Sequence, residues 1–221
     1  MSQEIIHVYL MPGMAASPKI FEHIKLPEHQ FKIHKLEWLI PYKKESLSDY
    51  ALRLLKTIKH NNIVLLGVSF GGVLVQEMSR YIKVRKLIIV SSVKSMHELP
   101  KRMLIAKVTK AYKLVPTQLA SNINVFAKYA FGSNVAKRLE LYKKYLSVNN
   151  SNYLSWAIEN MVCWNQEKYD AKIVHIHGES DAVFPIKNIK NCITIKGGTH
   201  IMIINKYKWF NENLPSIILE N

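Results

Sequence analysis

The segment Gly67-Val68-Ser69-Phe70-Gly71 has the form G-x-S-x-G. An apolar run that predicts a strand (62–67) precedes the serine, and a pattern that predicts a helix (71–81) follows it. A sharp turn between the two would hold the hydroxyl clear of the sheet, at the positive end of a helix that stabilises a developing oxyanion. Ser69 is therefore a candidate nucleophile. The alternative is a glycine-rich turn of a nucleotide-binding fold, but the chain has no G-x-G-x-x-G or lysine-bearing phosphate loop.

A serine nucleophile needs a base, and the base needs an orienting carboxylate. Asp181 and His200 follow two further predicted strands and give the chain order Ser, Asp, His. Open α/β sheets place their sites just past the carboxyl ends of strands. Asp181 is therefore the candidate acid and His200 the candidate base. Three alternatives remain: Asp181 is a surface turn residue, Glu179 is the acid, or His200 only caps the last helix.

Acyl transfer also needs two hydrogen-bond donors for the carbonyl oxygen. We expect one to be the backbone N–H of Phe70, the residue after the nucleophile. The other is expected from the loop after the first strand, where we choose the N–H of Met14 because Gly13 lets the backbone approach closely. An ordinary Pro-Gly turn would form the same loop.

Apolar runs and helical patterns alternate along most of the chain, which predicts an α/β fold with a mostly parallel sheet and helices on both faces. The interval between Val93 and Ala171 differs, because it contains only helical patterns. We predict a core of residues 1–93 and 171–221 with a helical insertion at 94–170. The expected strands are 4–10, 31–38, 62–67, 86–90, 172–177 and 191–195, the core helices 19–24, 46–60, 71–81 and 201–213, and the insertion helices 101–113, 123–131, 135–146 and 153–164.

Together these segments resemble the α/β-hydrolase superfamily, and are similar to its compact bacterial esterase-type members. The resemblance rests on the segments LMPGM (10–14), GVSFGG (67–72), HGESDAVFP (177–185) and GGTH (197–200), in that order. Two features differ: Pro12 stands where many relatives have histidine, and the usual first β-hairpin is absent. The sheet should then have six strands, with the first between the second and third. The resemblance implies that segment 94–170 is a lid that shapes the acyl pocket.

This resemblance and the candidate triad predict a serine hydrolase of the carboxylesterase or thioesterase type that forms an acyl-enzyme and needs no cofactor. The substrate would be a small acyl ester or thioester. An apolar acyl pocket is expected from Phe126, Phe131, Trp156 and Phe184, although such residues at helical spacing usually form core. A different class of function, a non-catalytic binding module on the same scaffold, is the alternative.

The chain has 221 residues, 48% of them hydrophobic, which suffices for one domain with its own core. The net charge of +15 favours acidic partners, yet a lysine-rich composition alone also explains it. One hypothesis is that the basic lid docks an acidic acyl carrier protein. We expect no nucleic-acid partner, because no such motif is present. The basic lid residues are Lys101, Arg102, Lys107, Lys110, Lys113, Lys128, Lys137, Arg138, Lys143 and Lys144.

Cysteine content and hydropathy suggest a cytoplasmic protein. Cys163 and Cys192 are too few for a disulfide framework and lack the spacing of a zinc site. No apolar run is long enough to span a membrane, and the amino-terminal apolar stretch lacks the basic residues of a signal peptide. His7, His175 and His177 fall within predicted strands, so we interpret them as buried core histidines and expect no metal site.

Overall fold

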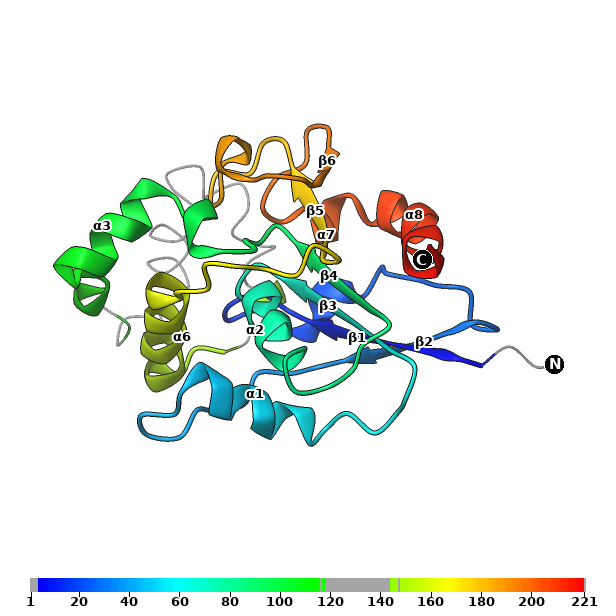
Figure 1. Cartoon of the computed structure of the whole chain (residues 1–221), viewed down its shortest axis with the longest axis horizontal. Coiled ribbons are helices and arrows are strands. Elements are labelled where there is room, and N and C mark those ends of the chain that lie inside the picture. The colour runs from blue at the N-terminus through cyan, green and yellow to red at the C-terminus, as the bar shows by residue number, and fades with distance from the viewer. Residues whose placement is uncertain (1–3, 116, 118–143, 147, 221) are drawn as a thin grey trace.

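A computed structural model describes residues 4–115, 117, 144–146 and 148–220 of the chain (Figure 1). Its centre is one six-stranded sheet in the order β2-β1-β3-β4-β5-β6, and every neighbouring pair of strands is parallel. The prediction of six strands with the first between the second and third is confirmed. The strands are β1 (Ile6–Met11), β2 (Phe31–Lys35), β3 (Ile63–Val68), β4 (Lys86–Val90), β5 (Val174–Gly178) and β6 (Ile193–Ile195).

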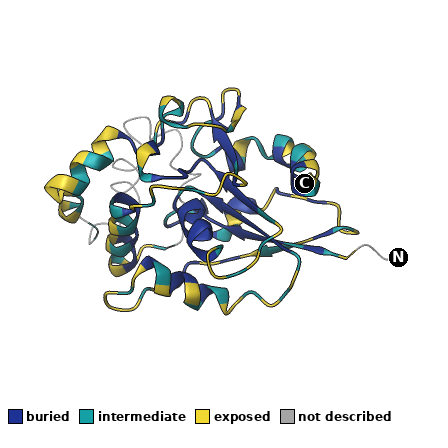
Figure 2. Ribbon diagram, in the orientation of Figure 1, coloured by how far each residue is buried: buried dark blue, intermediate teal, exposed yellow. Residues whose placement is uncertain are grey.

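Alternate residues of the central strands enter two separate hydrophobic clusters, one on each face of the sheet. Tyr9 and Leu65 belong to the cluster that contains α1, α2 and α6, whereas Val8 and Val64 belong to the cluster that contains α7 and α8. Both faces of β3 are buried, which explains its continuous apolar sequence. Figure 2 shows the burial concentrated in the central strands and α2.

The helices differ from the predicted ones mainly at their ends. Ser46 caps α1 by accepting the N–H of Asp49 at 3.0 Å, as one of the two predicted capping serines. The predicted closing helix is two helices, because the backbone departs from helical geometry at Lys206. The α-helices are α1 (Leu47–Leu55), α2 (Phe70–Met78), α3 (Lys101–Thr109), α6 (Ser151–Cys163), α7 (Met202–Asn205) and α8 (Tyr207–Leu219). The short 3₁₀ helices are η1 (Pro18–Phe21), η2 (Met96–Glu98), η3 (Ala111–Leu114) and η6 (Ile186–Asn188).

The segment between β4 and β5 contributes α3 and α6, which lie at the side of the sheet opposite the amino terminus (Figure 1). α6 buries five residues, whereas α3 buries none. The predicted helix 123–131 and most of the predicted helix 135–146 lie outside the described residues. Within the part of the chain that the structure describes, no helix is long and apolar enough to cross a membrane.

Candidate active site

Ser69 joins β3 directly to α2 in an unusual backbone conformation, with φ of 52° and ψ of −122°. A non-glycine residue with such a φ stores roughly 1–3 kcal/mol of strain, and such strain clusters at functional sites. The positions of the two flanking glycines leave no room for a side chain. A Cβ atom on Gly67 would collide with the carbonyl of Gly71, and one on Gly71 would collide with the carbonyl of Pro12. The predicted sharp turn is therefore present.

The hydroxyl of Ser69 lies within hydrogen-bond distance of a histidine that is 131 positions away in sequence. Its Oγ is 3.0 Å from Nε2 of His200. On the other side of the ring, Nδ1 of His200 is 2.9 Å from Oδ2 of Asp181. An ionised carboxylate can only accept, so a neutral His200 carries its proton on Nδ1 and offers the Nε2 lone pair to the serine hydroxyl. The structure thus brings together the three residues predicted from chain order.

The carboxylate of Asp181 is buried and held by backbone groups of its own loop. The residue is 4% exposed, and its Oδ1 accepts the N–H groups of Val183 and Phe184 at 2.8 and 2.9 Å. Burial raises the pKa of Asp181, but the charge of His200 and the hydrogen bonds outweigh it and hold that pKa below its usual value. Glu179, the alternative acid, is exposed and accepts the N–H of Gly197 instead.

Two further histidines extend this hydrogen-bonded line into the core of the protein. Nε2 of His177 is 2.8 Å from the carbonyl of Phe184 and 3.6 Å from Oδ2 of Asp181. Nδ1 of His177 is 3.1 Å from Nε2 of His175. Burial lowers the pKa of His177, and it lowers the pKa of His175 to about 2, so both rings are neutral at pH 7. The sequence placed them correctly in the core but gave no sign of their contact with the Asp181 loop.

The loop after β1 packs against the serine turn, as the sequence predicts. A Cβ atom on Gly13 would lie 3.4 Å from Cβ of Ser69. The carbonyl of Gly13 accepts the indole N–H of Trp38 at 2.8 Å and the N–H of Ala16 at 3.0 Å, which fixes the loop. Phe70 is the first residue of α2, so its N–H has no acceptor within the helix.

A mostly apolar cavity of about 440 Å³ opens beside the serine, within the size range of small-molecule sites. Ser69 and His200 lie in its wall, as do Met14 and Phe70. Arg102 of α3 also lines it, and donates to the carbonyls of Ala182 and Val183 at 3.0 and 2.7 Å.

The four aromatic residues proposed from the sequence for the pocket have different positions. Phe184 lines the cavity. Trp156 does not; its ring packs against Phe70 and Tyr50, and its indole N–H donates to the carbonyl of Glu45. Phe126 and Phe131 lie outside the described residues.

Comparisons with known proteins agree with this architecture. No protein-family model matches the chain, and no curated protein matches it. Solved structures do match over nearly its whole length. A bromoperoxidase from Bacillus anthracis is 18% identical, with 99% of this chain and 93% of that chain covered and a TM-score of 0.70. A hydrolase from Pseudomonas aeruginosa is 13% identical, with 97% and 90% covered and a TM-score of 0.71.

An esterase from Exiguobacterium antarcticum is 17% identical, with 100% of this chain and 94% of that chain covered and a TM-score of 0.64. These neighbours are α/β-hydrolases. At these identities the similarity establishes the architecture and not the chemistry. The chain therefore has the α/β-hydrolase fold.

Proposed function

We propose that the chain is a serine hydrolase that cleaves carboxylic ester or thioester bonds through Ser69, His200 and Asp181. The observation that carries the proposal is the hydrogen-bonded series from Asp181 through His200 to the strained Ser69, in the wall of an apolar cavity. The names of several structural neighbours, which are esterases, lipases and hydrolases, support hydrolysis on this scaffold.

In the first half of the reaction, Oγ of Ser69 attacks the substrate carbonyl while its proton passes to Nε2 of His200. Asp181 keeps the ring in the required tautomer and stabilises the imidazolium that forms. The backbone N–H groups of Phe70 and Met14 donate to the oxyanion of the tetrahedral intermediate. His200 then returns the proton to the leaving alcohol or thiol as the carbonyl–heteroatom bond breaks, which leaves an acyl group on Ser69.

In the second half, water attacks the acyl carbonyl and gives a proton to His200. Collapse of the second tetrahedral intermediate breaks the bond to Ser69, returns the proton to Oγ and releases the carboxylic acid. The acyl group is expected to lie in the apolar cavity beside Phe184, with the insertion 94–170 acting as a lid. Chemistry of this kind uses side chains, backbone N–H groups and water, and needs no cofactor.

The proposal is tested by hydrolysis of p-nitrophenyl esters from acetate to long acyl chains. We expect turnover by the wild type, and a loss of roughly 10⁴-fold or more in Ser69→Ala. The matched control is Ser180→Ala, which removes an exposed serine next to Asp181 and should leave the rate unchanged. A Ser69→Ala protein as active as the wild type would refute the nucleophile. A folded wild type that is inactive on every ester and thioester would favour a binding module.

A second candidate function is hydrolysis of acyl groups held by an acidic carrier protein. One observation favours it: α3 buries no residue, and Lys101, Lys110 and Lys113 in and after it are exposed. Other basic residues of the lid have partners within the chain. Lys144 pairs with Glu22, and Arg102 donates to two carbonyls.

Carrier docking would make turnover of carrier-bound substrate fall steeply with salt, because exposed charges are screened beyond about 10 Å at 0.1 M salt. Hydrolysis of a neutral ester should not change in the same way. The double variant Lys110→Glu/Lys113→Glu should reproduce the effect at low salt. Turnover of carrier-bound acyl groups that is insensitive to salt would refute this second candidate.

A further inference from the structure

Three histidines from separate segments meet on the face of the sheet that α1 and α2 cover. His7 is the second residue of β1, His34 lies on the edge strand β2, and His60 lies in the loop between α1 and β3. One ring nitrogen from each lies within 4.8 Å of the others, and all three side chains are partly buried. We call these three residues the histidine cluster. The proposed hydrolysis does not use it.

We propose that the histidine cluster binds a divalent transition-metal ion of the Zn²⁺ class. Imidazole nitrogens are ligands that suit Zn²⁺, Cu²⁺ and Ni²⁺, and three of them with an open fourth position form a known type of zinc site. Mg²⁺ and Ca²⁺ prefer oxygen ligands, and the cluster supplies none. Among the described residues, this is the one group of three or more such side chains with metal-binding spacing.

The spacing of the ring nitrogens is close to what a metal requires. Zn–N bonds of about 2.0–2.1 Å in tetrahedral geometry place two ligand nitrogens about 3.3 Å apart. Nδ1 of His7 and Nε2 of His34 are 2.9 Å apart, so this pair must open slightly, and the three ligand nitrogens all lie within 4.8 Å of one another. Two neutral rings in this contact share one proton, so a nitrogen lone pair already points between them.

One ring must turn for all three lone pairs to meet at one point. The rings of His7 and His60 are stacked, with centroids 3.7 Å apart and planes only 11° from parallel. Lone pairs lie in the plane of the ring, so two stacked rings cannot both face one ion. His60 belongs to a short loop without regular structure, whereas His7 and His34 are fixed on paired strands. We therefore expect His60 to be the ring that turns.

Tyr9 supplies the second-sphere contact that metal-binding histidines usually have. Its hydroxyl lies 2.7 Å from Nδ1 of His60 and accepts the N–H of Lys59 at 3.3 Å. If Nδ1 of His60 still donates to this hydroxyl after the ring has turned, the ring carries its proton there and Nε2 is the ligand atom. Because Tyr9 is itself buried in the sheet, it can direct that tautomer.

Burial and neighbouring charges act on two rings of the cluster. Burial, and then the neighbouring His60, lower the pKa of His7 and of His34. The ammonium of Lys32 acts in the same direction, while the carboxylate of Glu4 opposes it at His7. Lys32 also repels a bound cation, so we expect moderate rather than tight binding. A bound ion would join edge strand β2 to β1 and to the loop before β3.

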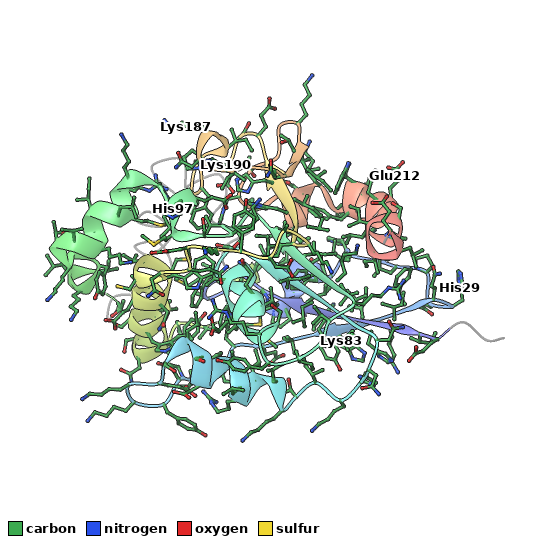
Figure 3. The ribbon with its side chains drawn as sticks, in the orientation of Figure 1. His29, Lys83, His97, Lys187, Lys190 and Glu212 are labelled. Atoms are coloured by element: carbon green, nitrogen blue, oxygen red, sulfur yellow. The ribbon has the colours of Figure 1, made fainter. Side chains whose placement is uncertain are left out.

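The test is a Zn²⁺ titration of the full chain, stripped of metal, by isothermal calorimetry at pH 7.5. We expect saturable binding of one ion per chain, and an affinity at least about tenfold lower in His34→Gln and in His60→Gln. His29→Gln is the matched control, because His29 is an exposed histidine in the turn before β2 (Figure 3) and should not affect binding. A roughly hundredfold excess of Zn²⁺ over its Kd should raise the Tm of the wild type by about 5 °C.

Two results would overturn the proposal. One is no saturable Zn²⁺ binding by the wild type. The other is binding that His34→Gln and His60→Gln leave intact and His200→Gln removes, which would place the ion at the triad. Circular dichroism verifies that each variant is folded. If a variant is not folded, the visible spectrum of Co²⁺ bound to the wild type decides instead. Three imidazoles and a water should give the absorption of a four-coordinate nitrogen site. The absorption of octahedral Co²⁺ would contradict binding at the cluster.

Discussion

Histidines lie close together in two regions of this sheet, and only one of these regions has a buried carboxylate in contact with the rings. At the carboxyl ends of the strands, His200 and His177, which belongs to β5, lie around the buried carboxylate of Asp181. In the histidine cluster, three imidazoles lie together without a carboxylate among them. A carboxylate fixes the tautomer of an imidazole and stabilises its charged form, which suits proton transfer. Without one, burial and then the neighbouring imidazoles disfavour the charged form of His7 and His34.

The largest expected effect is on the rate of ester hydrolysis, when the carboxylate of Asp181 is removed. Asp181→Asn should lower the kcat of ester hydrolysis by about 10⁴-fold, because the amide favours the wrong tautomer of His200. Glu179→Gln is the matched control and should have little effect, since Glu179 is exposed and contacts Gly197. Steady-state kinetics on one ester measures both. A large loss in Glu179→Gln with a small one in Asp181→Asn would reverse the assignment of the acid.

The second effect concerns acid stability near Asp181. The pKa of His175 is about 2 in the folded chain, against an ordinary value of 6.5, so the unfolded chain binds more protons between these values. The free energy of unfolding should therefore fall as the pH falls below 6.5, by about 2 kcal/mol from this residue between pH 7 and pH 5. Urea denaturation at the two pH values measures it.

His175→Gln should remove part of this pH dependence, and His29→Gln should not. The carboxyl of Asp181 does not contribute to this pH dependence, because its pKa is lowered and it stays ionised between pH 7 and pH 5. An equal slope in His175→Gln and in the wild type would show that burial of His175 does not oppose its protonation.

A smaller effect, on the free energy of unfolding, measures the backbone strain at Ser69 apart from its role in catalysis. Ser69→Gly should raise the free energy of unfolding by about 1 kcal/mol relative to Ser69→Ala, because glycine adopts a φ of 52° without a steric penalty. Both variants should be inactive. Denaturant titration of the pair measures the difference, and a less stable glycine variant would argue against strain at the turn.

The smallest expected effect tests whether the two regions are independent. His34→Gln should leave kcat and KM for ester hydrolysis within about twofold of the wild type, because distant sites without shared partners act additively. The same variant should lose Zn²⁺ affinity. A hydrolysis rate that changes together with Zn²⁺ binding would show that the two regions are coupled.

Much of the fold followed from the sequence because its signals are local. Apolar runs, together with the alternating apolar and polar pattern at 31–38, located all six strands. The run at β3 is buried on both faces, as a parallel central strand should be. The meeting of Ser69, Asp181 and His200 was predictable from chain order and strand ends. The break at Lys206 was not, because the apolar pattern continues across it into α8.

The sequence could not predict contacts that depend on tertiary packing. Trp156 has the residue type of a pocket wall, yet its ring packs against Phe70 and does not line the cavity. The histidine cluster depends on the register that pairs Tyr9 with His34, and on His60, which lies 53 positions beyond His7. No spacing in the sequence therefore predicts it. The prediction that His7 is a buried core histidine, made from its place in a strand, is wrong, because its side chain is only partly buried.

The central claim, that Ser69 is an activated nucleophile, is tested most directly by covalent labelling with an organophosphonate. Such a reagent captures a serine whose proton a neighbouring base removes, and leaves ordinary hydroxyls unmodified. Intact mass and peptide mapping should show one label per chain, on the peptide that contains Ser69, with little label in His200→Ala. A folded chain that takes no label, or takes it at another residue, would contradict the account.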